Sequence, residues 1–170
     1  MGIDPVENGI TSARAKYGDI ANLQFECDDL YTMAVPEEKY DIVVLRGVLH
    51  HLPDLSKGIA RACLFGKKII ILEPNGYNPV MKIIEKTSKY HIEHEEQSFR
   101  PKLLRDKFIG NGGRVVKDEY VNLVALFCPD WLARICKFFE PLVESIPLVK
   151  HIACGQYCFV VEMSQPKTKN

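Results

Sequence analysis

The stretch Tyr40–Asp54, YDIVVLRGVLHHLPD, sets the expected architecture of this chain. Its first part is nearly continuously apolar up to Leu45, as expected of a central strand that is buried on both faces of a parallel sheet. An Arg-Gly turn and two adjacent histidines follow, and the final Pro-Asp pair is typical of a helix start. The stretch therefore predicts a strand, a polar loop and a helix in succession.

The rest of the chain repeats this alternation of short apolar runs with stretches of helical periodicity, which predicts an α/β protein with a mostly parallel sheet. The expected strands are one ending at Ile3, Leu23–Cys27, Tyr40–Leu45, Lys67–Leu72, Arg114–Val121 and Gly155–Met163. The expected helices are Pro5–Tyr17, Leu55–Leu64, Asn78–Ser88, Pro101–Ile109, Pro129–Phe139 and Glu140–Val149. Because no linker rich in Gly, Ser or Pro interrupts them, residues 1–170 are expected to form a single domain.

The composition argues against two classes of protein, those that bind nucleic acid and those that span a membrane. With 22 basic and 22 acidic residues the formal charge is zero and the basic residues are scattered, so the sequence offers no case for a nucleic-acid partner. Six cysteines without a CxxC pair predict reduced thiols in a cytoplasmic protein. No apolar run approaches the length of about 20 residues that a transmembrane helix needs.

Acidic residues follow several of the expected strands. Asp4 follows the first, Asp28 and Asp29 follow the second, and Glu73 follows the strand that ends at Leu72. Ligands of open parallel sheets bind outside the carboxyl ends of the strands, so these acids are expected to converge on one crevice. There a carboxylate can accept the two hydroxyls of a ribose or the amino group of adenine. The alternative for Asp4 is a capping role at the start of the following helix.

Several segments together resemble the class I S-adenosylmethionine-dependent methyltransferases, of the small-molecule kind called type 11 or type 12. The segments are GIDP, FECDDL, YDIVVLRGVLHHLPD and KKIIILEPN, which stand in the family's order and span much of the chain. The resemblance implies a Rossmann-like fold with flanking helices and an antiparallel last strand. It also implies S-adenosyl-L-methionine as the cofactor and a small-molecule acceptor as the substrate.

The resemblance assigns a cofactor site. Asp4 would hold the ribose hydroxyls and Asp28 would face the adenine amino group, with Asp29 beside it through its backbone. Arg46 and Gly47 would border the methionine part, largely through main-chain atoms. The full cofactor-binding set expected from the resemblance is Asp4, Pro5, Cys27, Asp28, Asp29, Arg46 and Gly47.

One element of the family is not found in the sequence. The family's first strand ends in a glycine-rich turn that approaches the cofactor, and this turn is expected before Gly2. The only comparable cluster, Gly110–Gly113, follows a helix and enters a strand, which is the wrong context. The fold is therefore expected to lack its first strand, and this absence argues against activity of the isolated chain. The alternative function is a non-catalytic binding subunit or a fragment that another chain completes.

His50 and His51 are the candidate catalytic residues. Methyl transfer from a sulfonium is an in-line displacement, so alignment is the main requirement, and a base is needed only for acceptors such as hydroxyls. A histidine suits that role near neutral pH, and the sequence favours His51. The alternative is a histidine that bonds only to backbone at a helix start.

Two segments are expected to form a lid or the acceptor side: residues 76–100 and 126–150. The first contains YHIEHEEQSF, and His91, His94 and Glu73 are the expected substrate-side residues. His91, His94 and Glu95 have spacing compatible with a metal, but the sequence holds no second ligand cluster, so no metal site is predicted. A solvated charged loop is the alternative for this segment.

The second segment, residues 126–150, is expected to form two short apolar helices. Their helical spacing predicts core packing. A hydrophobic acceptor pocket, a homodimer face and an interfacial membrane contact remain as alternatives. The membrane contact is the weakest of these because few basic residues accompany the apolar ones.

Overall fold

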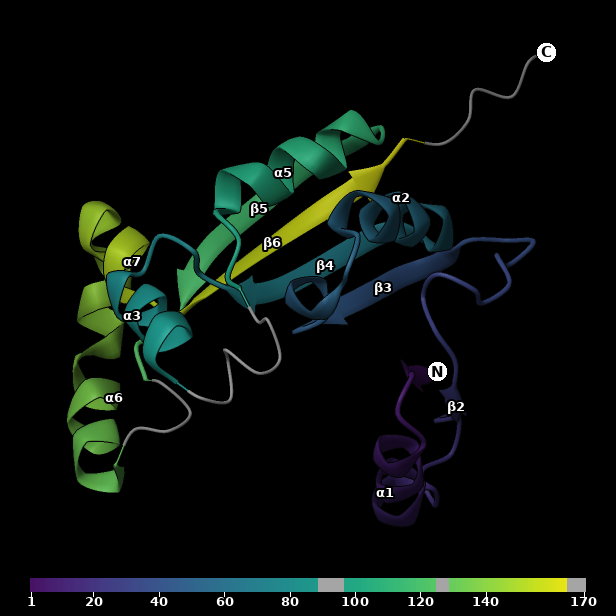
Figure 1. Cartoon of the computed structure of the whole chain (residues 1–170), viewed down its shortest axis with the longest axis horizontal. Coiled ribbons are helices and arrows are strands. Elements are labelled where there is room, and N and C mark those ends of the chain that lie inside the picture. Colours follow the sequence, from purple (N-terminus) through teal and green to yellow (C-terminus); the bar gives the residue numbers. More distant parts are fainter. Residues whose placement is uncertain (89–96, 125–128, 165–170) are drawn as a thin grey trace. The chain divides into compact units, whose positions relative to one another are not determined.

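The structure is a computed structural model that describes residues 1–88, 97–124 and 129–164 (Figure 1). The chain divides into two compact units, Met1–Glu37 and Glu38–Asn170, which are described separately below. A single domain over residues 1–170 stays a prediction.

The first unit contains two short strands and one helix. Strand β1 (Gly2–Asp4) pairs in parallel with β2 (Phe25–Cys27), and α1 (Glu7–Tyr17) connects them. Ile10 of α1 is buried, whereas most other side chains of this unit are exposed. This β–α–β connection is the type of unit that the sequence predicts for the start of the chain.

The second unit is built on a four-stranded sheet with the order β3-β4-β6-β5. The strands are β3 (Tyr40–Arg46), β4 (Gly66–Pro74), β5 (Gly113–Val121) and β6 (Gln156–Met163). Strands β3 and β4 are parallel, and β6 runs antiparallel to both β4 and β5. The predicted α/β class and the antiparallel last strand are thus confirmed.

In the described residues of the second unit, the helices are the 3₁₀ turn η1 (Leu49–His51), α2 (Leu55–Phe65), α3 (Pro79–Thr87), α5 (Pro101–Gly110), α6 (Asp130–Ser145) and α7 (Pro147–Ala153). The helix start predicted at the Pro53-Asp54 pair is confirmed, because the Asp54 carboxylate caps α2 by accepting the Lys57 N–H at 3.0 Å.

The core of the second unit lies on one face of the sheet, under α2 and α5 (Figure 1). Phe108 of α5 meets Phe159 of β6 edge to face, with 5.6 Å between the ring centroids. The two helices are also joined by a hydrogen bond from Lys107 Nζ to Ser56 Oγ at 2.6 Å. The fully buried apolar side chains on this face include Ile69, Ile71, Tyr157, Phe159 and Val161.

The segment 129–153 differs from the sequence prediction in two ways. Helix α6 runs without a break through Pro141 to Ser145, and the chain leaves the helix at Ile146, directly before Pro147. The residue before a proline avoids the helical conformation, and Ile146 is extended, so Pro147 sets the boundary between the helices. The prediction of core packing is also wrong for most of this segment, because its large apolar side chains, such as Phe138, are exposed.

Among the residues described, no helix is both long enough and apolar enough to cross a membrane. The described cysteines are free thiols: Cys27, Cys63, Cys136, Cys154 and Cys158.

Candidate functional site

Asp4 and Asp28 of the first unit lie together at the carboxyl ends of its two strands. In the parallel ladder Asp4 is the partner of Cys27, and the Asp28 N–H donates to the Asp4 carbonyl at 3.3 Å. The Cys27 thiol also approaches the Pro5 carbonyl at 3.6 Å. The predicted convergence of Asp4 and Asp28 on one edge is therefore present.

These carboxylates also organise their own turns. Asp4 Oδ1 accepts the Val6 N–H at 2.8 Å, directly before α1. Asp28 Oδ1 accepts the Asp29 N–H at 2.8 Å, and Asp29 Oδ1 accepts the Tyr31 N–H at 2.6 Å. Each of these bonds uses a single carboxylate oxygen. The capping alternative for Asp4 thus has a structural basis, and it is compatible with a second role for the same side chain.

In the second unit, the loop after β3 turns sharply at Gly47. Its φ is +63°, a conformation that side-chain-bearing residues rarely adopt. The Gly47 N–H donates to the Leu72 carbonyl at 2.9 Å, which holds the turn against the end of β4. Arg46, the last residue of β3, is exposed beside this turn. A glycine is therefore required where the loop leaves the sheet.

Glu73 holds this loop in place from the neighbouring strand. It lies near the end of β4 and is 1% exposed. Its Oε1 accepts the backbone N–H groups of Val48 and Leu49, each at 2.8 Å, and its Oε2 lies 2.8 Å from His50 Nδ1. Both carboxylate oxygens are thus engaged by the loop. The sequence predicts Glu73 as a substrate-side residue, but this geometry fits a residue that positions the loop and His50.

The two candidate catalytic histidines have different surroundings. The His50 side chain is 13% exposed and bonded to Glu73, whereas His51 is exposed at the end of η1. Their rings lie next to each other, with 4.0 Å between centroids. Of the pair, His50 is the one whose ring is oriented by a buried acid.

This orientation defines which nitrogen of His50 can act as a base. With Glu73 ionised, its Oε2 can only accept a hydrogen bond, so in that state Nδ1 of His50 is the donor. In the neutral imidazole the other nitrogen, Nε2, then carries the lone pair and is the proton acceptor. An acid that fixes the tautomer and the ring plane of a histidine in this way is a recurrent element of acid–base catalysis.

Two asparagines after β4 form a structural junction that the sequence analysis did not assign. Asn75 Nδ2 donates to the carbonyls of His151 at 2.9 Å and Cys154 at 2.8 Å, and Asn75 is fully buried. Asn78 Nδ2 donates to the carbonyl of Ala153 at 2.9 Å, while its Oδ1 caps α3. The Asn-Pro pair before α3 is a recognisable capping signal, but no sequence signal indicates the bonds to the end of α7.

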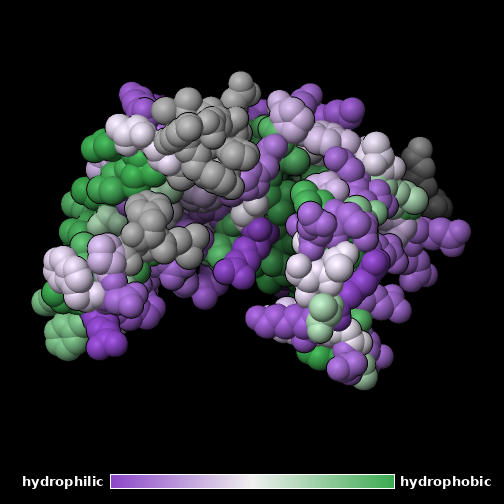
Figure 2. Space-filling view, turned by 60° about the horizontal axis from the view of Figure 1, so that its bottom comes forward, coloured by the Kyte–Doolittle hydropathy of each residue, from purple (hydrophilic) through white to green (hydrophobic). Residues whose placement is uncertain are grey.

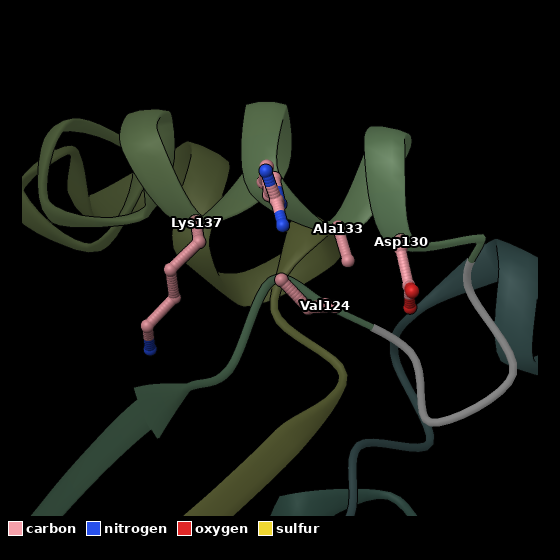
Figure 3. Close-up of a pocket in the computed structure, with 5 residues that line it drawn as sticks. Val124, Asp130, Ala133 and Lys137 are labelled. Carbon is pink, nitrogen blue, oxygen red and sulfur yellow. The ribbon is translucent and has the colours of Figure 1, made fainter.

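A hollow of about 420 Å³ lies beside α6 (Figure 3). Its lining consists of Val124, Asp130, Ala133, Arg134 and Lys137, and Figure 3 shows the side chains of Asp130 and Lys137 projecting from the same side of the helix. None of the predicted site residues lines it. The predicted substrate-side residues His91 and His94 lie outside the described residues.

The comparisons with known proteins agree with the sequence resemblance. Residues 1–65 match the family model described as a methyltransferase domain. The matched segment contains Asp4, Asp28 and both candidate histidines. No curated protein matches the chain in sequence.

Solved structures extend the likeness to nearly the whole chain. An S-adenosylmethionine-dependent methyltransferase from Archaeoglobus fulgidus is 15% identical, with a TM-score of 0.64 over 95% of this chain and 74% of its own. The fold is that of a methyltransferase. The same fold occurs in a Haloferax volcanii protein that is assigned as a methyltransferase and was solved with the Trm112 methyltransferase activator. That protein is 15% identical, with a TM-score of 0.68 over 96% of this chain and 71% of its own.

Magnesium protoporphyrin IX methyltransferase from Synechocystis PCC 6803, solved with bound S-adenosylhomocysteine, is 16% identical, with a TM-score of 0.60 over 96% of this chain and 63% of its own. At such low identities the likeness establishes the fold, and the resemblance seen in the sequence is confirmed at this level. The activity and the roles of individual residues are matters of proposal.

Proposed function

We propose that this protein transfers a methyl group from S-adenosylmethionine to a small-molecule acceptor, with His50 as the base on the acceptor side. The observation that carries the proposal is the position of Asp4 and Asp28 at adjacent strand ends, inside the segment that matches a methyltransferase domain. The methyltransferase fold and a neighbour solved with bound S-adenosylmethionine support the same cofactor here.

The residues of the first unit suit an adenosine. Asp4 and Asp28 offer carboxylate oxygens on neighbouring strands, and a ribose diol and an adenine amino group are both donors that such oxygens accept. Each carboxylate uses Oδ1 for its local turn, so the proposal assigns its Oδ2 to the ligand. Asp29, Pro5 and Cys27 complete the proposed cofactor set of this unit.

The proposed chemistry needs few side chains. When bound, S-adenosylmethionine would supply an electrophilic methyl group on a sulfonium, which would pass to the acceptor's lone pair while the electrons of the broken carbon–sulfur bond stay on sulfur. Where the acceptor is a hydroxyl, His50 Nε2 takes the released proton, while Glu73 keeps the ring in place through Nδ1.

The cofactor assignment is tested by calorimetric titration with S-adenosylhomocysteine. We expect Asp4→Asn and Asp28→Asn each to weaken binding at least about tenfold, as expected for a lost hydrogen bond to a charged group of about 1.5 to 3 kcal/mol. Asp19→Asn is the matched control, because Asp19 is an exposed acid in the same unit. Equal affinities for all three variants contradict the assignment, and no binding by the wild-type chain contradicts the function of the chain alone.

The assignment of the base is tested by turnover, measured as formation of S-adenosylhomocysteine with a panel of phenol, alcohol and amine acceptors. We expect His50→Gln to lower kcat on hydroxyl acceptors by about 10² to 10⁴, while the affinity for S-adenosylhomocysteine stays within a few fold. His51→Gln is the matched control and should retain most of the activity. A larger loss for His51→Gln than for His50→Gln contradicts the choice between the histidines.

A second candidate is a methyltransferase-like subunit that works only with another chain. The Haloferax neighbour, solved with a methyltransferase activator, favours this alternative. The same titration separates the two functions, since the alternative predicts binding of S-adenosylhomocysteine only after the partner is added.

A further inference from the structure

We infer that the exposed apolar side of α6 and α7 is a homodimer interface, in which it packs against the same surface of a second copy of this chain. The inference is independent of the proposed function. We define the α6–α7 apolar face as Trp131, Ile135, Phe138, Leu142, Leu148 and Ile152. These residues are large and apolar, and all of them are exposed, with Phe138 at 79% and Leu148 at 81%. Figure 2 shows hydrophobic side chains gathered at the end of the second unit that carries these helices.

Helix α6 is turned so that its polar side faces the protein. Glu140 is buried, pairs with Lys137 and accepts the Leu123 N–H at 3.2 Å. Glu144 accepts the Asn122 N–H at 3.0 Å. Since these contacts attach the helix to the segment after β5, the opposite side of α6 is the one presented outward. Exposure of that side therefore follows from how the helix is attached.

The outward side of α6 has the spacing of a helix-packing seam. Trp131, Ile135, Phe138 and Leu142 follow one another at intervals of four, three and four residues. This is the a/d pattern with which one helix packs into another. Helix α7 adds Leu148 and Ile152, and its end is fixed because Asn75 and Asn78 bond its last carbonyls.

The size of the α6–α7 apolar face fits a dimer. Aromatic side chains bury about 150 to 250 Å² each, so Trp131 and Phe138 alone present on the order of 300 Å² at the exposures found here. With the four aliphatic residues added, the face is larger than the smaller of the apolar patches of about 300 to 600 Å² that monomers carry. It is a substantial part of the roughly 800 Å² that each partner contributes to a stable protein interface.

The charges favour a second copy over a lipid surface. Residues 130–153 contain three Lys or Arg (Arg134, Lys137, Lys150) and three acids (Asp130, Glu140, Glu144), so their formal charge is zero. Helices that lie in a membrane surface carry a cationic polar side, whereas the polar side of α6 holds acids bonded within its own protein. Two neutral apolar faces can approach each other without repulsion, and a face that matches itself suits two-fold symmetry.

The test is the mass of the protein in solution across a concentration series, by light scattering after gel filtration and by sedimentation velocity. We expect the wild type to form a dimer. Phe138→Glu and, separately, Leu142→Glu should weaken the dimer by about 30-fold or more, because each places two unpaired carboxylates in the seam. Both residues are exposed, so far-UV circular dichroism should stay unchanged.

Ile109→Glu is the matched control. Ile109 is an equally apolar residue on α5, 50% exposed, and its replacement should leave the dimer intact. The proposal is overturned if the wild type is monomeric at every concentration, or if the seam variants dimerise as tightly as the wild type. It is also overturned if a monomeric wild type co-sediments with vesicles of phosphatidylcholine and phosphatidylglycerol.

Discussion

The two faces of the four-stranded sheet are made of similar residues but have different surroundings. On the covered face, Ile71 and Val161 are fully buried under α2 and α5. On the opposite face, Ile42 and Val44 of β3 are exposed, and Ile70 of β4 is half-buried. We call the second the open face. Since adjacent residues of one strand lie on opposite faces, the difference arises from the helices and not from the strand sequence.

This difference shows that an apolar sequence favours a strand but does not determine which faces of the strand are buried and so stabilised. Strand β3 has the nearly continuous apolar sequence of a strand buried on both faces. Within the described part of the second unit, α2 and α5 cover one face, and that face gains the free energy of packing a side chain on every side. Each prediction below compares one substitution or one thiol on the covered side with its counterpart on the open face.

The largest effect is expected from truncating neighbouring isoleucines of β4. Ile71→Ala, on the covered face, should lower the free energy of unfolding by about 2 to 5 kcal/mol, because it removes buried methyl groups and leaves a cavity. Ile70→Ala is the same change one residue earlier on the open face and should cost less than half as much. Urea unfolding followed by circular dichroism measures both values. Equal losses would mean that the open face is covered in solution.

An intermediate effect is expected from placing a hydroxyl on each face. Val161→Thr puts a polar group at a fully buried position of β6 and should cost about 1 to 3 kcal/mol. Val44→Thr makes the same exchange at a side chain that is 60% exposed, and the free energy of unfolding should change by no more than about 0.5 kcal/mol. Because the two amino acids are nearly equal in volume, the comparison isolates polarity from cavity formation. A cost at Val44 that matches the cost at Val161 contradicts the open face.

The sequence predicts the strands and the acids at their ends because both depend on local patterns. An apolar run identifies Tyr40–Leu45 as a strand. Asp4 and Asp28 each follow a predicted strand, and the carboxyl ends of parallel strands lie at the same edge of a sheet, so the two acids are predicted at one edge. The partners of Glu73 could not be predicted in this way. Its bonds to Val48 and His50 span about 25 positions and require the β3–β4 register that the fold provides.

The orientation of α6 is a second feature that could not be predicted from the sequence. An apolar stripe such as Trp131, Ile135 and Phe138 has the same spacing whether it faces a core or solvent. What decides the orientation is the docking of Glu140 and Glu144 on the segment after β5, which is a tertiary contact. The sequence therefore predicts an amphipathic helix but not the side on which it is covered.

The smallest effect concerns two cysteines. Burial raises the pKa of the Cys63 thiol, on α2 at the covered side, from 9.0 to about 11, although Lys39 partly opposes the shift. Cys158 of β6 alternates with buried Tyr157 and Phe159 and so lies on the open face; burial also raises its pKa, but the side chain is only half-buried. Since the thiolate is the reactive form, access and pKa both disfavour Cys63. In the native protein at pH 8, alkylation followed by mass spectrometry should modify Cys158 at least about tenfold faster than Cys63.

The raised pKa also fixes the direction of the pH dependence. The protonated Cys63 thiol is favoured in the folded state, so its contribution to stability is complete below the ordinary pKa of 9.0 and is lost as the pH rises through about 11. Modification of Cys63 should accordingly become faster over this range. Cys63→Ala keeps the site apolar and should abolish only the slow modification, while Cys158→Ala should abolish the fast one. Equally slow modification of both thiols would show that another surface covers the open face. The two faces would then differ in burial only when that covering surface is absent.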